Sequence, residues 1–237
     1  MSRQSGARRN DIIDLMLDEI DSKDSLDKDK DTIDLELALI SNAVAFFFAG
    51  FDTSSLTMAT VVYGLIKHPE VQTRVRQEIN DTIGDAENIT AEHLKYLKYL
   101  ENLINEALRF YGVTSHLQRI CTKDYKVPDT EFTIIKGTPV HVEYSAIVKE
   151  SFVHPDKFDP ENFDAENNPN KFGFSGFGQG PRSCIGMRYA YMALKMGLVK
   201  ILSKYSVVEC EQTVDKLVFD LVKNEYKGGV KFRVEKL

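Results

Sequence analysis

A glycine-rich stretch with a single cysteine, placed immediately before a helical pattern, constrains this chain more than any other feature. The stretch spans residues 172–190 and reads FGFSGFGQGPRSCIGMRYA. Six of its positions have a use that depends on residue type: Phe177, Gly178, Gly180, Arg182, Cys184 and Gly186. Glycines allow such a loop to bring its backbone close to a bound group, because they have no Cβ to obstruct it. The segment that follows, 185–204, has the periodicity of a helix.

The residue types around Cys184 suit a haem that is bound through its iron. The N-terminus of the following helix stabilises a thiolate, and N–H groups near the sulfur tune the potential of a bound metal. Arg182 carries the forked guanidinium that pairs with a haem propionate. Phe177 would shield the sulfur from water. We therefore expect Cys184 to be the thiolate ligand of a haem iron, with the glycines lying against the macrocycle.

Two other roles of a lone cysteine compete with this interpretation. Such a residue is most often a small buried hydrophobe, and one placed before a helix can be a hydrolase nucleophile. A nucleophile needs a partnering histidine, and none of the five histidines stands out as that partner. Five positions carry this estimate: Phe177, Gly180, Arg182, Cys184 and Gly186. These five residue types would occur at this spacing by chance on the order of once in ten thousand such chains. The haem interpretation is therefore preferred.

Composition limits the remaining possibilities. The chain has 237 residues, 43% of them hydrophobic, which is enough for one large domain or two small ones. Its net charge of -6 gives no electrostatic support for a nucleic-acid partner. The three cysteines are widely separated, which argues against a disulfide framework and against a zinc site. The apolar segment 37–51 is shorter than the ~20 residues of a bilayer span, so we expect a buried helix there rather than a membrane anchor.

The pattern along the chain predicts a mainly α fold with small antiparallel β-sheets. We expect a charged, flexible N-terminal segment over 1–34, with a loop at 18–34, and a single domain over 35–237. Helices are predicted at 33–67 (buried on most sides), 69–83, 99–111 and 185–204. Strands are predicted within 118–127, 131–137 and 138–144, and in the tail 206–237 around a turn at 227–229. Residues 149–183 are predicted to form a long ordered loop.

The cysteine loop resembles the haem-binding signature of the cytochrome P450 family. A second motif, AGFDTS at residues 49–54, resembles that family's oxygen-activation motif. Ala49 and Gly50 would face the haem, and Gly50 would thin the helix there. Thr53 can bond back to a carbonyl one turn earlier and open a local bulge. Asp52 and Thr53 would then deliver protons to dioxygen. A core helix with a polar kink is the alternative for this motif taken alone.

Two further positions fit the resemblance. Glu106 and Arg109 stand at i, i+3 on one helix face, which suits an ion pair; by itself, such spacing usually marks a weak surface pair. In the family the pair is buried and joined by an arginine from a later loop, where this chain has Asn162. Arg119 matches an arginine that contacts the second propionate, although a solvated arginine at a strand edge fits equally well.

Other stretches depart from the family pattern. Gly112 and Val113 stand where prolines are usual, and residues 147–153 lack the expected His-x-Asp-Pro. The resemblance covers only the C-terminal half of the P450 fold, so we expect the chain to represent an incomplete, single-domain portion of it, without the membrane anchor.

The resemblance also implies an activity. It implies haem b, iron protoporphyrin IX, and a monooxygenase that inserts one atom of dioxygen into an apolar organic substrate. Electrons would come from NADPH through a flavoprotein reductase, NADPH-cytochrome reductase, at the cytosolic face of the endoplasmic reticulum membrane. Two alternatives remain open at this point: a catalytically inactive haem-binding fragment, and a haem-free interaction domain whose motifs are relics.

Overall fold

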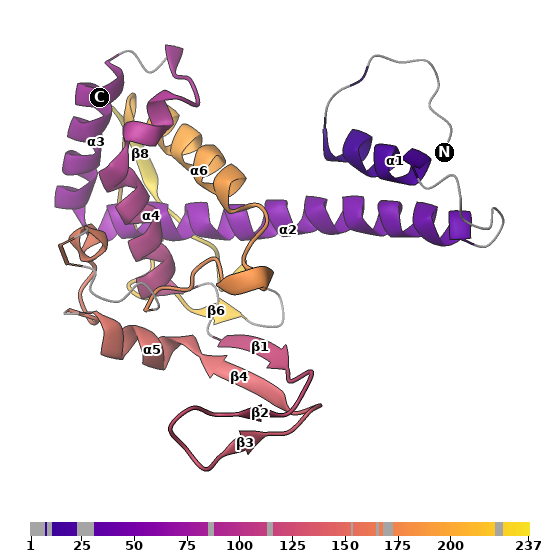
Figure 1. Cartoon of the computed structure of the whole chain (residues 1–237). Coiled ribbons are helices and arrows are strands. Elements are labelled where there is room, and N and C mark those ends of the chain that lie inside the picture. The colour runs from indigo at the N-terminus through magenta and orange to yellow at the C-terminus, as the bar shows by residue number, and fades with distance from the viewer. Residues whose placement is uncertain are drawn as a thin grey trace. The chain divides into compact units, whose positions relative to one another are not determined.

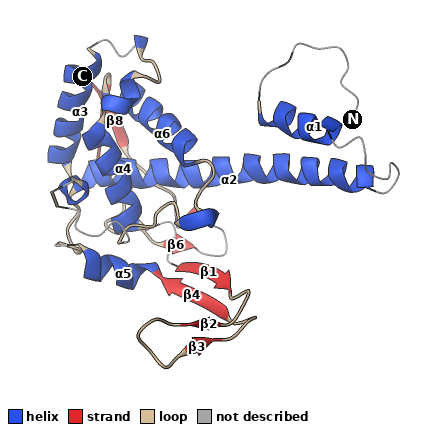
Figure 2. Ribbon diagram, in the orientation of Figure 1, coloured by secondary structure: helices blue, strands red, loops and turns tan. Residues whose placement is uncertain are grey.

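The computed structural model describes residues 8, 11–22, 31–84, 88–112, 116–152, 154–164, 166–167, 173–220 and 225–237 (Figure 1). Two compact units divide the chain, residues 1–53 and residues 54–237. Helices predominate, and the strands pair into four two-stranded antiparallel sheets in the described part of the chain (Figure 2). The predicted fold class, mainly α with small antiparallel β-sheets, is therefore confirmed.

The first unit begins with a capped helix. α1 (Ile12–Ser22) follows Asp11, whose Oδ1 accepts hydrogen bonds of 3.0 Å from the backbone N–H groups of Ile13 and Asp14. The cap satisfies donors that a first helical turn leaves unpaired. α2 spans Asp31–Lys67. The loop predicted for 18–34 is therefore wrong at both ends, because charged residues with a nearby cap tolerate a helix; its middle, 23–30, lies outside the described residues.

The apolar segment 37–51 of α2 is largely exposed. The exposed fractions of Leu37, Phe47 and Phe51 are 61%, 68% and 64%. The prediction of a helix buried on most sides is wrong here, because apolar composition does not determine which faces of a helix find packing partners. By length and composition alone, Leu37–Lys67 is apolar enough to cross a membrane.

The core of the second unit lies where the C-terminal half of α2 meets three further helices. These are α3 (Pro69–Ile83), α4 (Lys98–Tyr111) and α6 (Met187–Leu202). The side chains with no exposed surface at this junction include Val61, Leu65, Val75, Leu97, Leu100, Leu103, Ile104, Leu198 and Leu202. Since α4 contributes several of them along one stripe, its opposite positions are free to carry polar side chains.

Local signals set the bounds of α3, and a residue of α3 caps the start of α4. Pro69 is the first residue of α3, and Gly84 ends it with φ 67° and a 3.1 Å hydrogen bond from its N–H to Asn80 O. The carboxylate of Glu78 on α3 then accepts bonds of 2.7 and 2.9 Å from the N–H groups of Tyr99 and Leu100. α4 thus receives its N-terminal cap from another helix, after the short turn η2 (His93–Tyr96).

The strands form four separate pairs. β1 (His116–Ile120) pairs with β4 (Pro139–Glu143), and β2 (Tyr125–Lys126) pairs with β3 (Thr133–Ile134). In the tail, β5 (Tyr205–Val208) pairs with β8 (Arg233–Lys236), and β6 (Phe219–Asp220) with β7 (Glu225–Tyr226). Strands in both regions were expected from the sequence, and the turn at 227–229 is present, with positive φ at its two glycines.

The stretch between the sheets and α6 contains more structure than predicted. α5 (Tyr144–Ser151) overlaps the start of the predicted loop 149–183, and the short turns η3 (Pro160–Phe163) and η4 (Gly180–Arg182) interrupt it. The loop prediction is wrong at these places. α5 packs a small apolar cluster of its own, formed by Tyr144, Val148 and Phe152 with Phe163 and Phe174. The sequence did not indicate these short elements, because the stretch is rich in Pro, Gly, Asn and Asp, which are typical of turns and loops.

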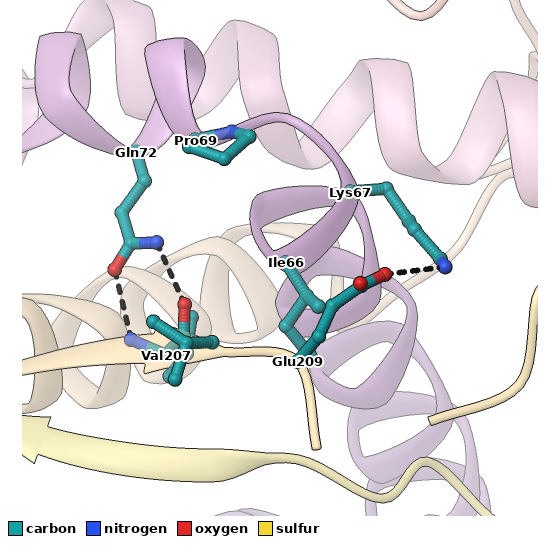
Figure 3. Close-up of a pocket in the computed structure, with 7 residues that line it drawn as sticks. Ile66, Lys67, Pro69, Gln72, Val207 and Glu209 are labelled. Carbon is teal, nitrogen blue, oxygen red and sulfur yellow. Dashed lines mark hydrogen bonds and ion pairs between the residues drawn. The ribbon is translucent and has the colours of Figure 1, made fainter. Parts of the chain in front are cut away.

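A side-chain amide completes the edge of β5. Gln72 on α3 donates a 2.9 Å hydrogen bond from Nε2 to Val207 O and accepts one of 2.9 Å from Val207 N (Figure 3).

Gln72→Met should lower the free energy of unfolding by about 1–3 kcal/mol, because both backbone groups lose their partner. Urea unfolding measures this. Gln77→Met, on the exposed face of α3, is the matched control; equal midpoints for the two variants would contradict the prediction.

Candidate functional site

The cysteine loop is a set of tight turns that ends on α6. Gly178 and Gly180 have φ values of 69° and 71°, a conformation that side chains with a Cβ adopt rarely. The N–H of Ser183 bonds to Gly180 O at 3.0 Å, and that of Cys184 bonds to Phe177 O at 2.7 Å. Cys184 stands two residues before Gly186, which is the N-cap of α6. The loop therefore presents its thiol at a helix N-terminus.

The thiol side of this loop is open. Cys184 is a free cysteine with an exposed side chain, and residues 179–185 are all exposed. A Cβ built on Gly186 would lie 4.0 Å from Cys184 Sγ, while one on Gly180 would meet no atom within 4 Å. A soft sulfur donor on an unobstructed, glycine-lined face has the ligand chemistry that a haem iron requires. The residues present thus fit a haem.

The far end of the loop is held by a buried tyrosine. The N–H of Ser175 donates a 2.9 Å hydrogen bond to the hydroxyl of Tyr144, and Ser175 O accepts one of 2.9 Å from Gly178 N. Burial raises the pKa of Tyr144 to about 12, so its hydroxyl stays neutral at physiological pH. Sequence reasoning missed this residue, because a tyrosine at the start of a short helix carries no motif.

The two arginines expected at the propionates are both exposed. Arg182 lies in η4, and within the described part of the chain its guanidinium has no ion-pair or hydrogen-bond partner. Arg119 lies on β1 and donates a 2.8 Å bond from Nη1 to Gln118 O. Neither guanidinium is committed to a carboxylate among the described residues, so both are free to meet an anionic group.

The motif at 49–53 belongs to the first unit. Thr53 Oγ1 donates a 2.5 Å hydrogen bond to Ala49 O, one turn earlier, as the sequence suggested. The helix nevertheless stays regularly α-helical through these positions, so the predicted bulge is wrong. The hydrogen bond from the Thr53 hydroxyl to Ala49 O does not by itself break the backbone hydrogen bonds of this helical turn. Gly50 is exposed, and a Cβ there would meet nothing within 4 Å. Asp52 is half-buried.

Glu106 and Arg109 form a bidentate ion pair inside the second unit. Arg109 Nε lies 2.6 Å from Glu106 Oε2, and Nη2 lies 2.7 Å from Oε1. The exposed fractions of the two side chains are 0% and 1%. The alternative of a surface pair is therefore wrong. Phe110 and Phe152 place their rings 5.4 and 5.1 Å from the guanidinium.

The remaining atoms of this pair are satisfied by the segment 155–162. Arg109 donates bonds of 2.7 Å to Pro155 O and to Lys157 O. Glu106 Oε1 accepts one of 2.7 Å from Asp159 N and one of 3.2 Å from Asn162 Nδ2. Asn162 thus fills part of the place that the sequence comparison assigned to an arginine. The backbone partners were not foreseen, because carbonyl and N–H groups carry no sequence signal.

One cavity of about 310 Å³ lies away from all these residues. It is lined by Ile66, Lys67, Pro69, Gln72, Val207, Val208 and Glu209 (Figure 3). Its polar groups are paired with one another: Gln72 with the backbone of Val207, and Lys67 Nζ with Glu209 Oε1 at 2.5 Å. None of the residues expected from the sequence lines it, so the site expected from the sequence is the exposed loop face and not this cavity.

Comparison with known proteins agrees with the geometry. The family profile described as Cytochrome P450 matches residues 1–232. Cytochrome P450 6a9 of Drosophila melanogaster is 34% identical over 99% of this chain and 48% of its own length. Cytochrome P450 3A14 of Cavia porcellus is 35% identical over 87% and 41%, and cytochrome P450 3A7 of Homo sapiens 34% over 89% and 42%. The chain spans less than half the length of these relatives. It belongs to the cytochrome P450 family.

Proposed function

We propose that the chain is the haem-thiolate portion of a cytochrome P450 monooxygenase, with Cys184 as the iron ligand. The observation that carries this proposal is the cysteine loop, where an exposed, free thiol stands at the start of α6 on a glycine-lined face. Family membership supports it, because haem-dependent monooxygenation is the activity that the family implies. Haem b, once bound, supplies the activation of dioxygen and its insertion into an apolar substrate.

The residues of this chain divide the remaining work. Cys184 would hold the iron and donate electron density to it, and Phe177, a half-buried residue of the same loop, would limit the access of water to the sulfur. Gly178 and Gly180 allow the positive φ values that the turns of the loop require, and Gly186 leaves the space beside the sulfur open. Arg182 and Arg119 would bind the propionates with guanidinium groups that meet no carboxylate among the described residues. Ala49 and Gly50 would contact the haem, a role supported by the family to which the chain belongs.

Asp52 and Thr53 hold protons for delivery to dioxygen. A carboxyl and a hydroxyl are both groups that take up and give up protons, and the family to which the chain belongs supports this role. In the whole enzyme that contains this chain, Thr53→Ala should lower the product formed per dioxygen consumed by about tenfold, because the hydroxyl that relays the proton is lost. Thr53→Ser, which keeps the hydroxyl, should retain the coupling. Parallel oxygen and product assays measure it, and equal coupling in the alanine variant would remove Thr53 from this role.

Electrons are supplied from NADPH by a flavoprotein reductase, and the whole enzyme lies at the cytosolic face of the endoplasmic reticulum membrane. Both parts of the proposal are supported by the family to which the chain belongs. The substrate is an apolar small molecule. The long, apolar and exposed start of α2 is compatible with a hydrophobic environment, since Leu37–Lys67 has the composition of a membrane-crossing helix.

The carbon monoxide spectrum tests the proposal. The chain is expressed with haem, reduced and treated with carbon monoxide, and the Soret band is recorded. A strongly red-shifted band is expected, because only a thiolate-ligated haem gives it. Absence of a haem signal would overturn the proposal and favour a haem-free domain. Turnover of an apolar substrate with reductase then separates an enzyme from an inactive haem-binding fragment, the alternative that Gly112 and Asn162 suggest by departing from the family pattern.

A further inference from the structure

Two polar pairs join α6 to α4. The hydroxyl of Tyr191 donates a 2.5 Å hydrogen bond to Asn105 Oδ1, and Lys195 Nζ lies 2.6 Å from Glu101 Oε2. The partners stand at i, i+4 on each helix, so the two pairs lie on one shared face, one turn apart. α6 begins at Met187, directly after the cysteine loop. The Tyr191–Asn105 pair is therefore one turn closer to that loop than the Lys195–Glu101 pair.

Tyr191 also touches the loop itself. Its ring centroid lies 4.9 Å from that of Phe177, at an angle of 46°. Phe177 in turn provides the carbonyl oxygen that accepts the 2.7 Å bond from Cys184 N. A short series of contacts therefore runs from Asn105 through Tyr191 and Phe177 to the backbone of Cys184. The Lys195 pair makes no such contact, since Lys195 bonds to Glu101 and to Leu94 O.

Asn105 is well placed to act as a fixed point. It is flanked on α4 by Glu106, whose carboxylate is held by Arg109, Asp159 N and Asn162. Rotation or translation of α4 at this point would break that network. The Tyr191 hydroxyl remains a donor at physiological pH, because burial and the nearby Glu101 raise its pKa above the ordinary value for tyrosine.

We infer that Tyr191 and Asn105 are positioning residues for the Cys184 sulfur. Their hydrogen bond fixes the ring of Tyr191 against Phe177, and Phe177 then holds the backbone of Cys184 in the turn that presents the thiol. This inference rests on the proposed function, in which Cys184 binds the haem iron. The Tyr191 hydroxyl on α6 thus helps to fix the position of the Cys184 sulfur. This residue belongs neither to the cysteine motif nor to the Glu106–Arg109 pair.

The test uses Tyr191→Phe, which removes the hydroxyl and keeps the ring. Amide hydrogen exchange of the full chain, read at Cys184 N–H, should become about tenfold faster, because the bond to Phe177 O opens more often. The amide of Leu198, buried in α6, serves as the internal reference for global opening and should not change. In the haem-loaded chain the share of haem with the red-shifted carbon monoxide band should fall at least about twofold. Asn105→Leu, which removes the acceptor, should act in the same way.

Lys195→Met is the matched control. It breaks the neighbouring α4–α6 pair, so it should lower stability while leaving both the Cys184 exchange, relative to Leu198, and the carbon monoxide band unchanged. Unchanged exchange at Cys184 in Tyr191→Phe would overturn the inference, and so would faster exchange with an unaltered band. Equal effects of Lys195→Met would overturn it as well, because any α4–α6 pair would then serve. Absence of a haem signal in the unsubstituted chain would instead overturn the proposed function, whatever the exchange shows.

Discussion

Cys184→Ala is expected to abolish the red-shifted carbon monoxide band completely. The variant removes the only atom proposed to bind the iron, and alanine offers no replacement ligand. Any haem retained by the remaining contacts would show the spectrum of a haem without a thiolate. The side chain is exposed, so loss of the sulfur leaves no buried cavity and should not unfold the protein.

The other two cysteines supply the controls. Cys121→Ala and Cys210→Ala should each keep the band. Cys210 is the more demanding control, because a hydrogen bond from Thr213 lowers the pKa of its thiol and makes it the more reactive candidate on chemical grounds. A band that survives in Cys184→Ala, or one that disappears in Cys210→Ala, would show that the ligand has been misassigned.

Glu106→Ala should lower the free energy of unfolding by about 3–5 kcal/mol, because it leaves the Arg109 charge buried without its partner. The same change removes the acceptor for Asp159 N and Asn162, so the segment 155–162 loses two of its hydrogen bonds to α4 and keeps those that Arg109 donates to Pro155 O and Lys157 O. Chemical denaturation followed by far-ultraviolet circular dichroism measures the loss.

The chain contains a pair of the same spacing for comparison. Glu92 and Lys95 also stand at i, i+3, with 2.5 Å between Oε2 and Nζ, but their side chains are 62% and 67% exposed. Glu92→Ala should leave the unfolding midpoint unchanged within error, because solvent screens exposed pairs and side-chain entropy opposes them. A loss below about 1 kcal/mol in Glu106→Ala would mean that water reaches Arg109 once the carboxylate is gone.

Local signals predicted the parts of this fold that depend on neighbouring residues. The predicted helix at about 69–83 agrees with α3, because Pro69 marks its first position in the sequence and begins it in the structure. The turns of the cysteine loop are likewise local, since Gly178 and Gly180 adopt the positive φ values that favour glycine. The i, i+3 spacing indicated that Glu106 and Arg109 can pair, and only the family resemblance indicated that the pair is buried.

Features that depend on distant backbone could not be predicted. Nothing in the sequence marks the carbonyls of Pro155 and Lys157 as partners of Arg109, because every residue carries such a group. The exposure of 37–51 was missed for a related reason. An apolar helix pattern indicates that the helix needs a surface to pack against, but it does not indicate whether the described part of the chain supplies that surface. The hydroxyl of Tyr191 carries no motif, and only its 2.5 Å bond to Asn105 distinguishes it.

The cap that Glu78 places on α4 has a consequence for tolerance to insertion. Because the first N–H groups of α4 are satisfied by a residue of α3, the connection between the two helices does not have to set where α4 begins. Residues added within that connection would cost little closure entropy and would leave the helical register unchanged. The side chains of Asn105, Glu106 and Arg109 therefore keep their places even when the connection between α3 and α4 varies in length.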